Sequence, residues 1–200
     1  GIRSLEIGAN HMYLSKFDNM SVEELLEYIS EFRSDNIFAI AELIYHGVSL
    51  EKIHEVTMIT PFFLEAFKNI IDMEEQLRVR KDAEILTAAK KMGFGDKYIA
   101  RMWNCTEMDV YNMRKELNLF PAFKMVDTCH TNAYIPYFYS SYTGENTSIL
   151  TDKKKIIVLG AGPIRIGQGV EFDYSTVHAV MTIRNAGYEA IIINNNPETV

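Results

Sequence analysis

The hydrophobic positions of residues 21–120 recur at the spacing of amphipathic helices. Ser21 and Glu24 have the spacing of a capping box, which predicts that the first helix begins there. The same pattern predicts further helices over residues 35–46, from Ser49, from Thr60 and Pro61, and over residues 81–92, 96–102 and 106–117. The fold class that follows is mainly α, with a multi-helix domain at its centre.

The expected core lies on the apolar faces of these helices. Residues 35–46 are apolar nearly all round, which predicts a central helix that ends at Gly47. The apolar positions expected to pack in the other helices are Leu25, Leu26, Ile29, Phe32, Ile53, Phe62, Phe63, Phe67, Ile70, Ile71, Leu77, Ile99, Trp103, Met108, Val110 and Met113. The acidic pairs Glu23-Glu24 and Glu74-Glu75 are expected on solvated helix faces.

The segments that flank the helices have a different composition. Residues 1–20 show no clear period, and we expect a loose lead-in there. Residues 125–129 look extended, and residues 133–142 are rich in aromatic side chains around Pro136, which excludes a central strand. The polar, turn-forming residues 143–148 are the best candidate for a domain boundary. The predicted domains are therefore 1–20, 21–148 and 149–200.

Residues 149–200 show the pattern of a β-loop-α-β unit. The apolar runs 154–159 and 189–193 predict two parallel strands that are buried on both faces. A helix is expected between them over residues 173–185, with Gly187 as its C-cap. The side chains expected to face the sheet are Val177, Val180, Met181 and Ile183. The loop after the first strand and Glu198 after the second should then share one rim of the sheet.

A glycine-rich loop follows the first of these strands. Its glycines are Gly160, Gly162, Gly167 and Gly169. A dinucleotide-binding loop would need a glycine where Arg165 stands, and a P-loop would need lysine after Gly167, where Gln168 stands. Both common nucleotide-binding patterns therefore fail. The alternative is a loop whose glycines only allow tight turns.

Longer motifs carry a resemblance to a known family. GAGPIRIGQGVEFDYS at 160–175 and AGYEAIIINNNPETV at 186–200 closely resemble the start of the second synthetic half of the carbamoyl phosphate synthetase large subunit, an ATP-grasp enzyme. VDTC at 126–129 and PYFYSSY at 136–142 resemble the segment that closes its oligomerisation domain. That domain joins the two synthetic halves, and residues 41–71 are similar to it. The chain departs from the family at residues 130–132, which are His-Thr-Asn.

The resemblance implies a ligase that makes carbamoyl phosphate from bicarbonate, glutamine-derived ammonia and ATP, for pyrimidine or arginine synthesis. It implies ATP with Mg²⁺ or Mn²⁺ and K⁺ for the parent protein, and a glutamine amidotransferase small subunit as partner. Because the ATP-grasp domains would lie before residue 1 and beyond residue 200, we expect a fragment that binds no cofactor and is inactive by itself. The helical domain is expected to self-associate.

The same resemblance indicates which residues line the route of carbamate between the two active sites. By their place in the motif these are Arg165, Gly169, Glu171 and Glu198. Glycine at 169 leaves room for a small anion, which Arg165 would pair with, and the glutamates would provide polar lining. No catalytic residue and no metal ligand is expected in this chain.

Composition and charge exclude several classes of protein. The net charge of −7 opposes non-specific binding to nucleic acid or to anionic membranes. No apolar run is long enough to span a membrane. Cys105 and Cys129 form no disulfide framework, which fits a cytoplasmic protein, and with His130 they lack the spacing of a zinc site. His11, His46 and His54 show no partner carboxylate at a characteristic spacing.

Two other functions stay open from the sequence. One is a free-standing helical interaction module. The other is a helix-turn-helix DNA-binding protein, because residues 96–102 and 106–117 have the proportions of that motif. This second alternative is disfavoured, because residues 96–119 carry equal numbers of acidic and basic side chains, whereas recognition modules carry a basic excess.

Overall fold

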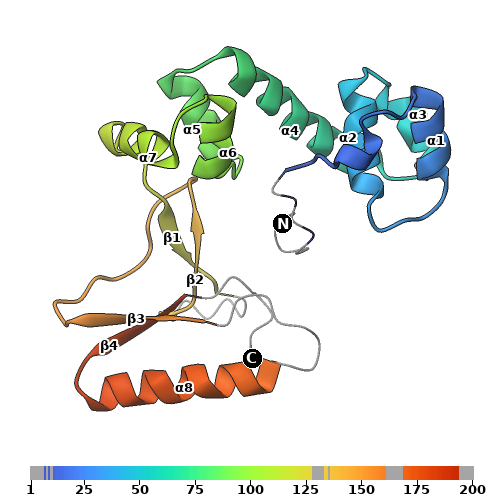
Figure 1. Cartoon of the computed structure of the whole chain (residues 1–200). Coiled ribbons are helices and arrows are strands. Elements are labelled where there is room, and N and C mark those ends of the chain that lie inside the picture. Colours follow the sequence, from blue (N-terminus) through green and yellow to red (C-terminus); the bar gives the residue numbers. More distant parts are fainter. Residues whose placement is uncertain are drawn as a thin grey trace. The chain divides into compact units, whose positions relative to one another are not determined.

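The computed structural model describes residues 7, 9, 11–127, 133–134, 136–160 and 169–193, without the side chains of residues 169–173 (Figure 1). The chain divides into two compact units, residues 1–148 and 149–200. Helices dominate the first unit, and the second contains a small β-α-β arrangement, so the predicted mainly α fold class is confirmed.

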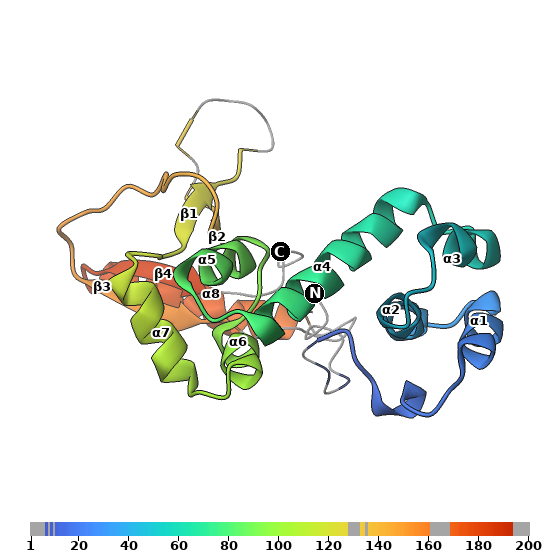
Figure 2. The ribbon, with the colours of Figure 1, turned by 90° about the horizontal axis from the view of Figure 1, so that it is seen from above.

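The first unit consists of two groups of helices joined by one long helix, α4 (Pro61–Val79). At one end of α4 lie α1 (Val22–Ser30), α2 (Asn36–Tyr45) and α3 (Leu50–Thr57), and at the other end lie α5 (Ala83–Lys91), α6 (Asp96–Met102) and α7 (Glu107–Glu116) (Figures 1 and 2). The helices begin where the capping residues predict. The Glu24 N–H donates to Ser21 Oγ at 3.2 Å, and Thr106 and Asp109 form a second capping box at α7.

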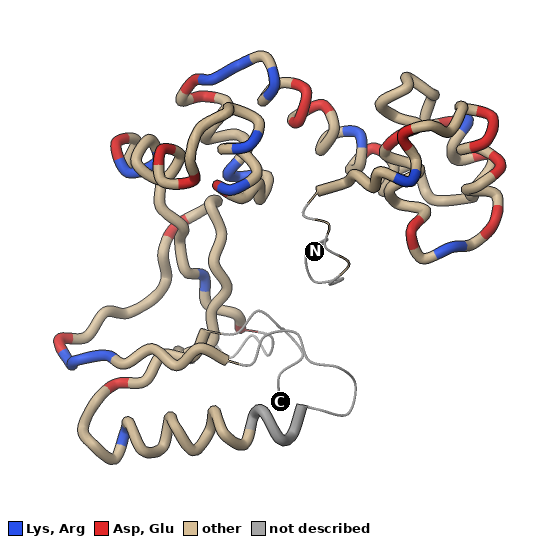
Figure 3. The backbone as a smooth tube through the Cα atoms, viewed as in Figure 1, with Lys and Arg blue, Asp and Glu red and all other residues tan. Residues whose placement is uncertain are grey.

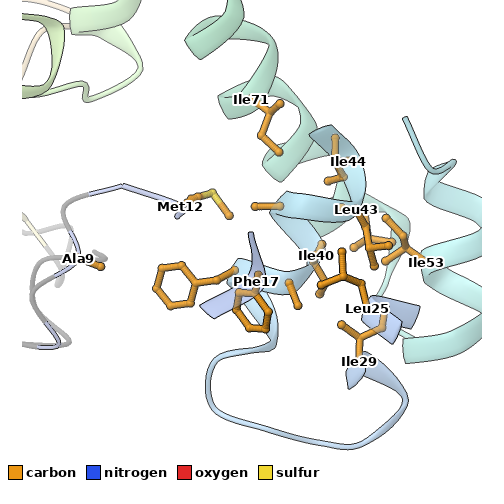
Figure 4. Packing of buried hydrophobic residues seen from close by; sticks show 14 residues of the cluster. Ala9, Met12, Phe17, Leu25, Ile29, Ile40, Leu43, Ile44, Ile53 and Ile71 are labelled. Atoms are coloured by element: carbon orange, nitrogen blue, oxygen red, sulfur yellow. The ribbon is translucent and has the colours of Figure 1, made fainter. Parts of the chain in front are cut away.

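Each group of helices has its own hydrophobic core. In the first, α2 is the central helix that the sequence predicts, with its buried side chains packed against α1, α3 and the start of α4 (Figure 4). In the second, Trp103 lies among the buried side chains of α4, α5 and α6, and its Nε1 donates to the Leu77 carbonyl at 3.0 Å. α4 therefore contributes to both cores, which makes it the structural link between them.

Residues 11–20 are not the loose lead-in that we expected. Met12 and Phe17 belong to the first core (Figure 4), and Phe17 lies in a short 3₁₀ turn, η2 (Ser15–Phe17). The Phe17 side chain is only 1% exposed, and its ring meets the Tyr28 ring edge-on at a centroid distance of 5.2 Å. The segment shows no period because it inserts single apolar residues between helices and does not form a helix face of its own.

Several predicted core positions are exposed instead. α1 ends at Ser30, so Phe32 lies beyond the helix and is fully exposed. Phe62 and Phe63 lie in the first turn of α4, which extends past the first core, and Met108 is exposed on α7. The opposite error occurs at Glu74, which is buried rather than solvated. Helical spacing places these side chains on a face, but the neighbouring elements decide whether that face is covered.

The first unit ends in a two-stranded antiparallel hairpin of β1 (Ala122–Met125) and β2 (Phe138–Ser141). Pro136 precedes β2 and interrupts no ladder, which agrees with the sequence. Of the predicted extended stretch 125–129, Met125 closes β1, while residues 128–129 lie outside the described residues. The Thr147 N–H donates to the Phe123 carbonyl at 2.9 Å, so the polar segment before the second unit covers the outer edge of β1.

The second unit pairs β3 (Lys155–Leu159) in parallel with β4 (Glu189–Ile193), connected through α8 (Gly169–Asn185). Gly187, with a φ of 87°, closes α8 as predicted. The prediction that both strands are buried on both faces is wrong. Most of their side chains are exposed, because α8 covers one face and no further strand or helix of this unit covers the other among its described residues.

The helix α8 also departs from the sequence prediction. It begins at Gly169, earlier than the predicted residue 173. Val180 and Ile183 are half-buried as expected of sheet-facing residues, whereas Val177 and Met181 are exposed. None of the helices in the described part of the chain has the length and apolar character needed to cross a membrane.

Candidate functional site

The carboxyl ends of β3 and β4 meet at one edge of the parallel sheet. Leu159 and Ile193 are register partners, and the Gly160 N–H donates a hydrogen bond of 2.8 Å to the Ile193 carbonyl. The two strands therefore end side by side, at the residues that precede the glycine loop and Asn194 in the sequence. In open parallel sheets, ligands bind at this edge, which makes it the first candidate site.

The residues predicted to line the carbamate route are only partly within the described chain. Arg165 and Glu198 lie outside the described residues, as do Gly162 and Gly167. Gly169 is the first residue of α8, and Glu171 follows in the first turn without a described side chain. The structure thus places the strand ends and the start of α8, and the roles of these residues stay predictions.

A second candidate is a buried ionic cluster in the first unit, formed by Lys90, Asp96 and Arg114. Asp96 Oδ1 accepts from Lys90 Nζ at 2.7 Å, and Asp96 Oδ2 accepts from Arg114 Nε at 3.0 Å. The Tyr142 ring lies over both cations, 4.7 Å from Lys90 Nζ and 5.5 Å from Arg114 Cζ. These contacts tie α5, α6 and α7 together and hold the end of the hairpin on them.

One carboxylate serves two cations in this cluster. Burial alone would raise the pKa of Asp96, but the hydrogen bonds from Lys90 and Arg114 outweigh it and lower that pKa. Burial lowers the pKa of Lys90, because Asp96 offsets its desolvation only in part and Arg114 adds repulsion. Lys90 Nζ also donates to the Phe94 carbonyl at 2.7 Å and lies over the Tyr142 ring. The cluster is a structural clamp whose polar groups already have partners.

A third polar cluster lies where the two cores meet along α4, around the carboxylate of Glu74. Glu74 is 3% exposed, and Tyr45 donates a hydrogen bond to it from α2. Tyr98 on α6 lowers the pKa of this carboxylate, which places its hydroxyl near Glu74. The His11 ring stacks on Tyr13 at 5.5 Å and lies 5.3 Å from the Tyr98 ring. The cluster connects both helix groups with the N-terminal segment.

Burial and the nearby charges shift the pKa values of Glu74 and His11. Burial raises the pKa of Glu74, although its bond to Tyr98 and nearby Arg78 oppose this. Burial, followed by repulsion from Arg101 and Arg78, lowers the pKa of His11. Among the described residues, no donor or acceptor pairs with His11 Nδ1.

We therefore predict that His11 and Glu74 make the stability of the unchanged chain depend on pH in opposite directions. The folded state resists protonation of His11, so stability is lost as the pH falls below about 6.5. The folded state favours protonation of Glu74, so stability is lost as the pH rises above about 4.3. Unfolding free energies measured between pH 4 and 8 should show the first loss disappear in His11→Phe and the second disappear in Glu74→Gln. Unchanged slopes in both variants would contradict this assignment.

The structure bears on the helix-turn-helix alternative. α6 and α7 have the expected lengths, and both acidic and basic residues occur along them (Figure 3). However, Arg114 in the last turn of the second helix is buried against Asp96 and is not free to contact phosphate. Since phosphate contacts supply much of the affinity of such modules, the surface of α7 does not favour DNA binding.

The remaining candidates are single side chains. Within the described ranges, no group of His, Cys, Asp and Glu side chains has the arrangement of a metal site. The prediction that His46 has no partner carboxylate is wrong. Its Nε2 lies 3.5 Å from Oε1 of Glu42, one helical turn earlier. Cys105 is a free, half-buried thiol, and Cys129 lies outside the described residues.

Sequence reasoning missed both buried polar clusters. For Glu74 a signal was present, since it lies three residues after Ile71 and three before Leu77 on the apolar stripe of α4. For Asp96 there was none, because Lys90 and Arg114 come from two other helices and approach it only through the tertiary fold.

Two family descriptions match the chain in the order of its two units. Residues 1–118 match the family described as carbamoyl-phosphate synthetase large chain, oligomerisation domain. Residues 152–200 match the family described as carbamoyl phosphate synthase preATP-grasp domain. The first match alone covers more than half of the chain, 118 of its 200 residues.

Proposed function

The chain belongs to the carbamoyl-phosphate synthetase large-chain family, and on that premise we propose that it joins and assembles the catalytic parts of such an enzyme. It contains the oligomerisation domain, residues 1–118, followed by part of a preATP-grasp domain, residues 152–200. The observation that carries the proposal is this order of matches, together with a helical unit that has two buried cores of its own.

The parent protein in this proposal is a glutamine-dependent ligase. It forms carbamoyl phosphate from bicarbonate and ammonia with ATP and Mg²⁺ or Mn²⁺, with K⁺ as a further cation. A glutamine amidotransferase small subunit delivers the ammonia, and the enzyme works in the cytoplasm. The helical unit, residues 1–148, serves as the connecting domain, and residues 149–200 belong to the second synthetic half.

The chain by itself is proposed to be catalytically inactive, because both matched families describe domains other than the ATP-grasp domains. Incubation with ATP, Mg²⁺, bicarbonate and ammonia should give neither ADP nor carbamoyl phosphate above a protein-free control. Turnover that scales with the amount of chain would contradict the proposal.

We propose that Arg165, Gly169, Glu171 and Glu198 line the route of carbamate in the parent enzyme. The support is the motif, together with the position of Gly169 at the start of α8, since the N-terminus of a helix favours an anion. In the complete large subunit, Glu171→Gln and Glu198→Gln should raise the ATP consumed per carbamoyl phosphate formed. Glu189→Gln is the matched control, because it changes a carboxylate at the opposite end of β4. If the ATP consumed per carbamoyl phosphate stays unchanged in the first two variants, the assignment of Glu171 and Glu198 to the carbamate route is wrong.

A further inference from the structure

An exposed apolar patch lies where the chain turns from α3 into α4. Its side chains are those of Met58, Phe62 and Phe63, which together we call the α3–α4 patch. They are 75%, 70% and 56% exposed, respectively. The two phenylalanine rings contact each other edge to face at a centroid distance of 5.4 Å. The two rings therefore form one continuous surface.

The backbone under the patch is well fixed. Met58 caps α3 in the left-handed conformation with a φ of 58°, and its N–H donates to the His54 carbonyl at 2.7 Å. Pro61 occupies the first turn of α4, and the neighbouring Leu64 is fully buried in the first core. Large apolar side chains are not needed for this turn, since glycine or asparagine suits the left-handed position better than methionine. Local structure thus gives no reason for the patch.

The size of the patch fits the centre of a protein interface. With about 200 Å² for a fully exposed side chain of this size, the three exposures amount to about 400 Å². A standard interface buries about 800 Å² per partner, with an apolar centre and a polar rim. The patch would therefore supply about half of one side, and the rim would supply the rest.

The surrounding charges do not oppose contact between identical copies. On α3, Lys52 pairs with Glu55 at 3.4 Å, and on α4, Lys68 pairs with Asp72 at 2.6 Å. Because these pairs and Glu65 place side chains of both signs near the patch in the sequence, two copies can approach without bringing together large surfaces of one sign.

We propose that the α3–α4 patch is the surface through which two copies of this chain associate, each patch packing on the other across a two-fold axis. The inference rests on the proposed function, in which the helical unit self-associates. We choose a second copy as the occupant because the patch lies wholly within residues 1–118, which match a family named for oligomerisation. A two-fold contact brings the same surface of both copies together, so one apolar patch on each copy is enough to form it.

The test compares three forms of the 200-residue chain by sedimentation velocity over a dilution series. The first is the unchanged chain, and the second carries Phe62→Ser and Phe63→Ser. The third is a matched control with Phe32→Ser and Val79→Ser, which also removes two exposed apolar side chains from the helical unit. Far-UV circular dichroism checks that all three are equally helical.

The proposal predicts a dimer dissociation constant about 30-fold higher, or more, in the patch variant, because central aromatic residues dominate interface energies. The control should dissociate like the unchanged chain. If all three forms dimerise alike, the patch is wrong while self-association stands. If the unchanged chain stays monomeric throughout, the self-association of the proposed function fails as well.

A second variant keeps the proposal testable if the double substitution disturbs folding. A chain with Phe63→Cys, Cys105→Ser and Cys129→Ser carries one thiol, which would lie near its counterpart across the two-fold axis. Mild oxidation should give a disulfide-linked dimer in high yield. The same background with Phe32→Cys should give little, and equal yields from the two positions would overturn the proposal.

Discussion

Replacing Asp96 by alanine is expected to lower the free energy of unfolding by about 3–5 kcal/mol, because it leaves two buried cations without their carboxylate. Lys90 and Arg114 are 6% and 9% exposed and both bond to Asp96, so neither can reach water without opening the packing of α5, α6 and α7. Total stabilities of small domains are about 5–15 kcal/mol. The loss would therefore be a large part of what holds the second core together.

The measurement is urea unfolding followed by the fluorescence of Trp103, the only tryptophan of the chain, which lies in the same core. Glu84→Ala is the control, because it removes an exposed carboxylate that pairs with Arg80 on the surface. Its unfolding midpoint should match that of the unchanged chain. Equal effects of the two substitutions would show that the buried cluster is no more important than a surface ion pair.

The second large effect is expected from Phe17→Ala, at about 3–5 kcal/mol, through loss of apolar burial and creation of a cavity. Phe17 is almost completely buried between η2, α1 and α2. Phe32→Ala is a closely matched control, because the same side chain is removed from a position that is 104% exposed. Urea unfolding followed by far-UV circular dichroism should separate the two clearly. A Phe17 variant as stable as the Phe32 variant would contradict the finding that residues 11–20 contribute to the first core.

The sequence predicts much of the local structure because the signals are local. Capping at Ser21, the apolar helix α2, and the left-handed glycine at the end of α8 all depend on residues within a few positions of one another. The parallel pairing of β3 and β4 follows from the handedness and length of their connection. These features were all found in the structure.

Burial is where sequence reasoning fails, because it depends on elements that meet only in the fold. Phe62 and Phe63 have the spacing of core residues, but the first core ends before it reaches them. Glu74 is buried because Tyr45 and Tyr98 arrive from α2 and α6 to satisfy its carboxylate. The assignment of residues to the carbamate route rests mainly on the motif, since Arg165 and Glu198 lie outside the described residues.

The central claim is that two buried cores stabilise the helical unit, whereas the two-stranded sheet of the β-α-β unit is largely exposed among the described residues. Hydrogen exchange of the whole chain tests it most directly. Amides of α2 and α4, which line the buried cores, should exchange only through global unfolding, while amides of β3 and β4 should exchange much faster, since their side chains and strand edges are exposed. Equal protection of β3 and α2 would contradict the account.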